Sequence, residues 1–276
     1  MGDYRYKALQ NLTRARFFAV QNLVKEKQRF MNVLFKKYST MTQEKVFSDT
    51  FSTTALAVYD EFDSAEALAN MDLHALTDFI MEKGKKRFPN PDAVAKAIQK
   101  AARSSYRLPK TVNDSVNQVL SISITSMKAL ESQIKEFDKA IKDQMELLPN
   151  VLISILGIGP VYSAGIMAEI GDINRFNNQA ALAKYAGLAW KQHQSGGFES
   201  EVTRLIPSGN RFLKYYLCEA AFSLVRCDKE YSDFYHLKYK EVNRCQHKRA
   251  LALTARKFVR LVFRLLKDNR LYRPAK

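Results

Sequence analysis

The spacing of apolar residues along the chain predicts a mostly helical protein. Residues 4–38 carry apolar side chains at mixed steps of three and four, the period of a helix with one apolar face. Residues 116–148 follow a heptad pattern with the same alternating steps, in which only Ser123 and Gln144 interrupt the apolar seam. Pro149 ends this pattern, because proline cannot continue a helix. We predict a long antiparallel, coiled-coil-like helical pair; a seam between two copies of the chain is the alternative.

A small helical insert is expected between the two long patterns, over about residues 46–107, at the tip of the pair. Its helical patterns cover residues 65–68 after a candidate N-cap at Ser64, residues 70–81 and residues 92–106. The basic stretch 83–87 is a candidate contact with a phosphate backbone, and a solvated loop is the alternative. The predicted organisation is a helical region with this insert over residues 1–148 and a compact second domain over residues 149–276.

The second domain opens with a pattern that fits a helix-hairpin-helix element over residues 152–170. Gly157 and Gly159 flank Ile158 at the turn, and Pro160 follows. Glycines permit positive φ and leave the backbone bare, so N–H groups at the start of the second helix can meet a phosphate. Such contacts position DNA without reading its sequence. The alternative is an ordinary turn between helices, in which the glycines only allow close packing.

A serine in a glycine-rich loop is the candidate nucleophile. A small apolar helix ends at Gly187, and Ser195 then stands directly before Gly196 and Gly197. A serine in this setting has little side-chain crowding and can present its hydroxyl to a phosphorus atom. Residues 201–206 predict a short β-like segment after it. From spacing alone, an ordinary loop is the alternative.

Two later segments are further candidates for phosphate contacts. Gly209, Asn210 and Arg211 begin a helix, and the first turn of a helix offers N–H groups to anions. Residues 247–268 predict a C-terminal helix with a basic stripe opposite an apolar face. That stripe can follow a nucleic-acid backbone, and a solvated face is the alternative.

Net charge narrows the class of partner. The chain has 276 residues, with 44 Lys and Arg against 28 Asp and Glu, which gives a formal charge of +16. An excess of this size favours a polyanion, and nucleic acid is the commonest. No apolar run approaches the roughly 20 residues of a membrane span, so we expect no membrane partner. The three cysteines have no metal-site spacing and are typical of reduced thiols, which predicts a cytoplasmic protein.

Five short segments together resemble the C-terminal domain of the insertion sequence one-ten family of transposases, a DEDD transposase family that includes the pilin-gene invertase and bridge-RNA-guided recombinases. They come in the family's order and spacing: Gly157-Ile158-Gly159-Pro160, Glu169-Ile170-Gly171-Asp172, Tyr185-Ala186-Gly187-Leu188, Gln194-Ser195-Gly196 and Gly209-Asn210-Arg211. The N-terminal basic helix and the heptad region also resemble the family's middle region. The resemblance covers nearly the whole chain.

By this resemblance, Ser195 stands at the family's nucleophile position. In the family, the serine at this position attacks a DNA phosphodiester and forms a phosphoserine link, which implies a catalytic role for Ser195. The resemblance also implies Mg²⁺ bound by four acidic residues of an N-terminal ribonuclease-H-like domain. We find no matching acidic pattern here, so we expect no cofactor and no metal ligand in this chain, and Mg²⁺ only with that missing acidic domain.

The resulting functional prediction is a DNA transposition or site-specific recombination protein. It binds DNA and carries the serine half of a composite strand-transfer site. The alternative is a non-catalytic nucleic-acid-binding remnant or regulator that pairs with a full-length transposase. The expected partners are DNA, a guide (bridge) RNA, and either a second copy of the chain or a full-length transposase.

Overall fold

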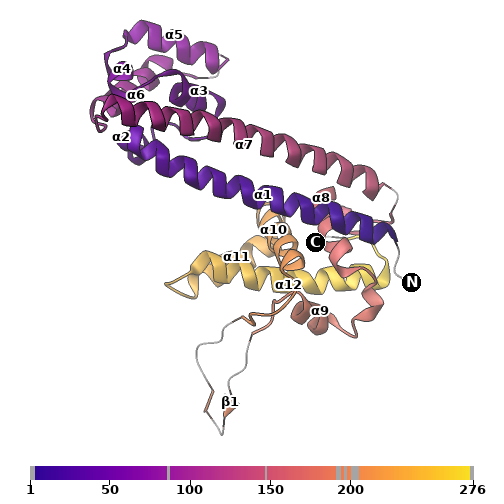
Figure 1. Cartoon of the computed structure of the whole chain (residues 1–276). Coiled ribbons are helices and arrows are strands. Elements are labelled where there is room, and N and C mark those ends of the chain that lie inside the picture. The colour runs from indigo at the N-terminus through magenta and orange to yellow at the C-terminus, as the bar shows by residue number, and fades with distance from the viewer. Residues whose placement is uncertain are drawn as a thin grey trace. The chain divides into compact units, whose positions relative to one another are not determined.

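The protein is mostly α-helical, as the apolar spacing predicts (Figure 1). The computed structural model describes residues 4–85, 88–146, 148–190, 194–195, 198–199 and 205–273. These form two compact units, one of Ala19–Gln133, here called the insert unit, and one of Met1–Phe18 with Ile134–Lys276, here called the terminal unit. The long helices α1 (Tyr4–Lys37) and α7 (Lys110–Met145) each contribute residues to both.

The insert unit is built on the second part of α1 and the first part of α7, which run in opposite directions within it (Figure 1). Ser123 donates a 2.6 Å hydrogen bond to Glu26, and Lys27 lies 3.2 Å from Glu131, so polar contacts join the two helices. Four heptad positions in this unit, Val116, Leu120, Ser123 and Met127, are buried, and a fifth, Leu130, is half-buried. The apolar stripe therefore faces the unit's core, while coiled-coil interlocking along it stays a prediction.

Five shorter helices complete the insert unit: α2 (Ser39–Glu44), α3 (Thr53–Glu61), α4 (Ala65–Asn70), α5 (Leu73–Lys83) and α6 (Pro91–Arg103). The N-cap at Ser64 is confirmed, because its hydroxyl accepts a 3.0 Å hydrogen bond from the Ala67 N–H. Asn90 caps α6 in the same way, with Pro91 at the first helical position, where its missing N–H costs nothing. Helix α3 was not among the predicted helical patterns.

The terminal unit packs its helices around α10. Its elements are η1 (Leu152–Ser154), α8 (Pro160–Ile170), η2 (Ile173–Arg175), α9 (Gln179–Tyr185), β1 (Gln194–Ser195), β2 (Phe198–Glu199), α10 (Arg211–Cys227), α11 (Lys229–Lys240) and α12 (Gln246–Asp268). Helix α10 contacts α8, α11 and α12. A Cβ atom on Gly165 would lie 2.3 Å from the ring of Tyr216, so the glycine lets α8 and α10 approach closely.

The first residues of α1 belong to this unit through its core. Leu9 is fully buried in the same apolar cluster as Ile141 and Met145 of α7. The Tyr216 hydroxyl donates a 2.7 Å hydrogen bond to the backbone oxygen of Thr13. The compact units therefore divide the chain inside α1 and α7, a different place from the boundary predicted at residues 148 and 149. The physical reason is that a long helix can bury its two ends in different cores.

None of the helices in the described ranges combines the length and apolar composition needed to cross a membrane.

Candidate nucleic-acid interface and serine loop

Ser195 lies in a segment whose two ends are joined by backbone contacts. Three backbone contacts join residues 185–190 to residues 205–210: Asn210 N–H to Tyr185 O at 2.7 Å, Ile206 N–H to Ala189 O at 2.9 Å, and an antiparallel bridge between Trp190 and Leu205. We call this paired region the stem. Beyond it, β1 and β2 pair antiparallel, with Ser195 opposite Phe198.

Several sequence predictions fall outside the described residues. Gly196 and Gly197, between β1 and β2, are among these, and so is most of the β-like segment predicted over residues 201–206. Leu205, at the end of that segment, forms the bridge to Trp190. For Ser195 itself, the structure gives its backbone pairing, and its catalytic role stays a prediction.

Two glycines make the stem possible. Gly187 has φ +69° and Gly209 has φ +135°, conformations that side-chain-bearing residues rarely adopt. A Cβ atom on Gly209 would lie 2.5 Å from the backbone nitrogen of Gly187. The predicted helix stop at Gly187 is present, because α9 ends at Tyr185 and Gly187 adopts positive φ. Close backbone packing is therefore one reason for a glycine at 209, independent of any contact with DNA.

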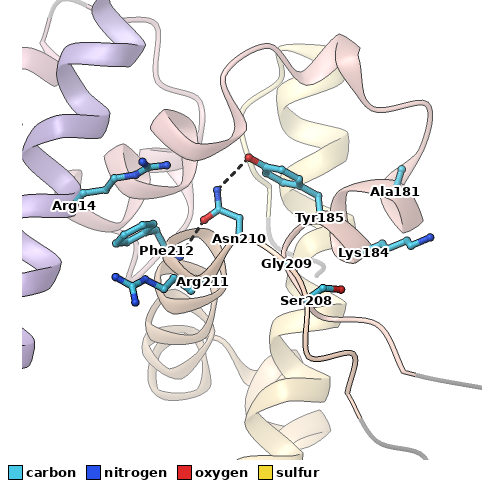
Figure 2. A pocket seen from close by; sticks show the side chains of 9 residues that line it. All are labelled: Arg14, Ala181, Lys184, Tyr185, Ser208, Gly209, Asn210, Arg211 and Phe212. Atoms are coloured by element: carbon cyan, nitrogen blue, oxygen red, sulfur yellow. Dashed lines mark hydrogen bonds between the residues drawn. The ribbon is translucent and has the colours of Figure 1, made fainter.

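An open pocket of about 690 Å³ lies against this stem (Figure 2). Its lining contains no acidic side chain; it consists of Arg14, Ala181, Lys184, Tyr185, Ser208, Gly209, Asn210, Arg211 and Phe212. Lys184 and Arg211 are exposed, and neither forms an ion pair with an acidic side chain in the described ranges. The pocket therefore presents positive charge that is not neutralised within the described part of the chain.

Glu169 is the buried centre that organises the pocket wall. Its side chain is completely buried, and its carboxylate accepts hydrogen bonds from Arg14 Nε at 2.7 Å and Arg14 Nη2 at 2.9 Å. The Asn210 amide donates to the same carboxylate at 2.7 Å and to the Tyr185 hydroxyl at 3.1 Å. These hydrogen bonds from Arg14 to Glu169 raise the pKa of the Arg14 guanidinium.

The sequence pattern around Glu169 indicates a buried charged residue, although no role was predicted for it. Glu169 is the one charged residue in α8, whose other residues are apolar, small or uncharged. A charged residue on such a helix is buried only when it is paired. The pattern could therefore have indicated a buried ion pair, but not its partners, because Arg14 and Asn210 lie far away in sequence.

Asn210 begins α10 as predicted, and its side chain acts as the N-cap. Its Oδ1 accepts 3.0 Å hydrogen bonds from the N–H groups of Phe212 and Leu213. Its amide is held by Glu169 and Tyr185, so both ends of the side chain have partners within the protein. These contacts show Asn210 shaping the pocket, and its direct contact with DNA stays a prediction.

The helix-hairpin-helix element predicted over residues 152–170 differs from the structure in its first helix. The first helix is a single 3₁₀ turn, η1, and only α8 after it is a full helix. Gly157 has φ +87°, and its carbonyl accepts a 2.7 Å hydrogen bond from the Ser223 hydroxyl. Gly159 has an ordinary φ of −84°, and no atom lies within 4 Å of a Cβ built on it. Of the two glycines, Gly159 is thus the one whose surroundings are open.

No group of three or more His, Cys, Asp or Glu side chains in the described part of the chain could hold a metal ion.

One segment of the chain matches a known protein family. Residues 150–236, which contain the stem and most of the pocket wall, match the family model described as Transposase IS116/IS110/IS902 family. This segment is thus similar to the transposases of that family. The resemblance drawn from the motifs is confirmed, and residues 150–236 form a transposase domain of the IS116/IS110/IS902 family.

Similar proteins include three from bacterial insertion elements. The uncharacterized 44.8 kDa protein of insertion element IS116 from Streptomyces clavuligerus is 27% identical, covering 84% of this chain and 57% of that protein. The uncharacterized 43.6 kDa protein of IS110 from Streptomyces coelicolor is 26% identical, over 68% and 51%. The transposase for insertion sequence element IS1111A from Coxiella burnetii is 27% identical, over 70% and 51%. The chain thus spans little more than half the length of these relatives.

Proposed function

We propose that this chain acts in DNA transposition or site-specific recombination, where it binds DNA and presents Ser195 to a phosphodiester. The observation that carries the proposal is the position of the basic pocket against the stem of the segment that contains Ser195. The family match over residues 150–236 supports the same reading.

Electrostatics favours DNA in this pocket. Lys184 and Arg211 have no acidic partner in the described ranges, so their charge is available to phosphates. Arg14 forms an ion pair with Glu169. This pair holds the pocket wall in place and has no net charge. The overall charge of +16 adds a long-range attraction that falls steeply with salt.

In the proposed reaction, the Ser195 hydroxyl oxygen attacks the phosphorus of a DNA phosphodiester. A bond forms between the Ser195 oxygen and phosphorus, and the bond from phosphorus to one strand oxygen breaks. The Ser195 hydroxyl gives up its proton, and the leaving strand oxygen takes up one, so the protons balance. A serine hydroxyl is a weak nucleophile without an adjacent base or other activation. We therefore propose that the acidic domain of a full-length transposase completes the site, and that Ser195 of this chain by itself is inert.

The test is covalent capture on labelled DNA that spans the end of the element. The chain is incubated in Mg²⁺ with this DNA, with or without the acidic domain of a longer relative, and resolved under denaturing conditions. We expect an adduct only in the combined mixture, and none with Ser195→Ala. Ser121→Ala, at an exposed serine of α7 outside the pocket, is the matched control and keeps the adduct.

An adduct that survives Ser195→Ala would move the nucleophile elsewhere, and an adduct formed by the chain without the added domain would contradict its inertness. Salt-dependent DNA binding without any adduct in the combined mixture would favour the second candidate, a non-catalytic regulator. That candidate is supported by the lack of a metal-binding side-chain cluster in the described ranges.

We also propose a guide RNA, and a second copy of the chain or a full-length transposase, as partners. The support is the net charge and the family match. Sequencing of RNA that co-purifies with the chain, together with light scattering of the chain alone and mixed with a full-length relative, tests both.

A further inference from the structure

An aromatic ring between two arginines forms one side of the pocket. The Cζ atom of Arg14 lies 4.6 Å from the centroid of the Phe212 ring, and the Cζ atom of Arg211 lies 4.8 Å from the same centroid. Figure 2 shows the two side chains on either side of Phe212. Guanidinium groups in this position are attracted by the negative face of the ring.

The two arginines differ in what else they contact. Arg14 gives two hydrogen bonds to the buried carboxylate of Glu169, so its charge is paired and its orientation is fixed. Arg211 is exposed and has no acidic partner in the described ranges. The outer member of the stack is therefore a planar cation that remains available to a ligand.

Further aromatic rings surround Arg211 at the surface. Its Cζ atom lies 5.2 Å from the ring centroid of Phe18 and 5.7 Å from that of Phe17. Phe18 contacts Phe212 edge to face at 5.7 Å between centroids, and 46% of Phe18 is exposed. Aromatic rings beside an unpaired cation are the groups on which the bases of a single strand stack.

We propose that Phe18 and Arg211, with Phe212 supporting the Arg211 guanidinium, form a stacking platform for an unpaired nucleotide of the nucleic-acid substrate. This inference rests on the proposed function and narrows its substrate class. In a duplex the faces of a base are covered by its neighbours, so only an opened or single strand offers a face to a ring or a guanidinium. Charge complementarity supports a nucleic acid as the ligand, because Lys184 in the same pocket has no acidic partner in the described ranges and can contact a phosphate.

The test compares single-stranded and duplex probes on the full chain. Fluorescence anisotropy measures the affinity for oligothymidylate, oligouridylate and a duplex of mixed sequence. We expect Phe18→Ala to weaken single-strand binding at least about fivefold, the low end of one lost base–aromatic stack, and to leave duplex binding unchanged. Tyr106→Ala is the matched control, because Tyr106 is 64% exposed and lies in the insert unit; it should bind all probes as the unsubstituted chain does.

Two Arg211 variants separate stacking from charge. Arg211→Lys keeps the charge and removes the planar group, so it should weaken single-strand binding without changing its salt dependence. Arg211→Gln removes the charge as well, and should lower the salt slope by about 0.7. A 2-aminopurine placed in the single strand should be quenched by the unsubstituted chain and remain bright with Phe18→Ala.

Unchanged single-strand affinity of Phe18→Ala, or an equal loss for single strand and duplex, would overturn the platform. So would a change of oligomeric state in Phe18→Ala, which would assign the patch to protein association. Preference for the deoxyribose or the ribose probe identifies the strand that uses the platform. Adduct formation at Ser195 is a separate measurement, so its absence would contradict the proposed function while leaving the binding result intact.

Discussion

The backbones of Gly187 and Gly209 touch at the foot of the segment that carries Ser195. A Cβ atom built on Gly187 would lie 2.9 Å from the Ser208 carbonyl oxygen, and one built on Gly209 would lie 2.6 Å from the Gly187 Cα atom. Residues 22 positions apart in sequence thus meet without side chains between them. Because this contact joins the end of α9 to the start of α10, it holds the pocket wall and the stem together.

Gly209→Ala should destabilise the protein strongly. The added methyl would meet the Gly187 backbone, and alanine is strained at φ +135°. We expect a loss of at least about 2 kcal/mol in the free energy of unfolding, measured by urea denaturation. Gly159→Ala is the control: its φ is ordinary and the space around it is open, so the loss should stay below about 1 kcal/mol. Equal stability of the two variants would remove the steric argument.

Glu169→Gln should weaken both the fold and the pocket. The substitution leaves the Arg14 guanidinium without its counter-charge and disturbs the hydrogen bond to Asn210. Since Arg14 is partly exposed, we expect a loss of roughly 1–3 kcal/mol, less than for a fully buried pair. Thermal unfolding measures it. Glu131→Gln, in the surface pair with Lys27, should change stability by no more than about 0.5 kcal/mol. An unchanged unfolding temperature of Glu169→Gln would show that the hydrogen bonds to this carboxylate do not stabilise the fold.

Gly159→Val tests the hairpin as a DNA contact. The open space around Gly159 should accommodate the side chain, so the circular dichroism of the helices should be unchanged. A branched side chain at this position would keep a phosphate backbone from the N–H groups at the start of α8, and duplex DNA affinity should therefore fall. Ala129→Val, on an exposed position of α7, controls for a general effect of valine. If a folded Gly159→Val protein binds DNA with unchanged affinity, the hairpin contributes to packing and does not contact DNA.

Lys37 should make the stability of the insert unit depend on pH. It is buried, its ammonium donates a 2.9 Å hydrogen bond to the Tyr59 carbonyl, and burial lowers its pKa from 10.5 to about 8 against the opposing effect of Asp63 and Asp60. Between these two pKa values the unfolded chain binds more protons than the folded one, so this contribution to stability rises with pH. It is complete above pH 10.5 and lost as pH falls through about 8.

Lys37→Met should abolish that contribution, which amounts to roughly 3 kcal/mol at most. Urea denaturation of both proteins across pH 8 to 10.5 checks it, because other titrating groups cancel in the difference. A constant difference in unfolding free energy across that range would show that Lys37 stays charged in the folded state.

The sequence by itself determined what depends on local spacing. The long helices, the Ser64 cap, the helix stop at Gly187 and the start of α10 at Asn210 follow from periodicity and from residues a few positions apart. The order of the short motifs also sufficed to place residues 150–236 in their transposase family. Helices α3 and α11 were not predicted, although Ala55, Val58 and Tyr59 in α3, and Tyr231 and Tyr235 in α11, are buried at helical spacing.

Only the tertiary structure decided how distant segments combine. It buried Leu9 with Ile141, so the units divide within the long helices rather than after Pro149. It joined Arg14 to Glu169 across 155 positions and thereby left Arg211 as the unpaired arginine of the Phe212 stack. Periodicity reports which face of a helix is apolar. It does not report which other face will cover it, because that choice depends on the packing of all the helices at once.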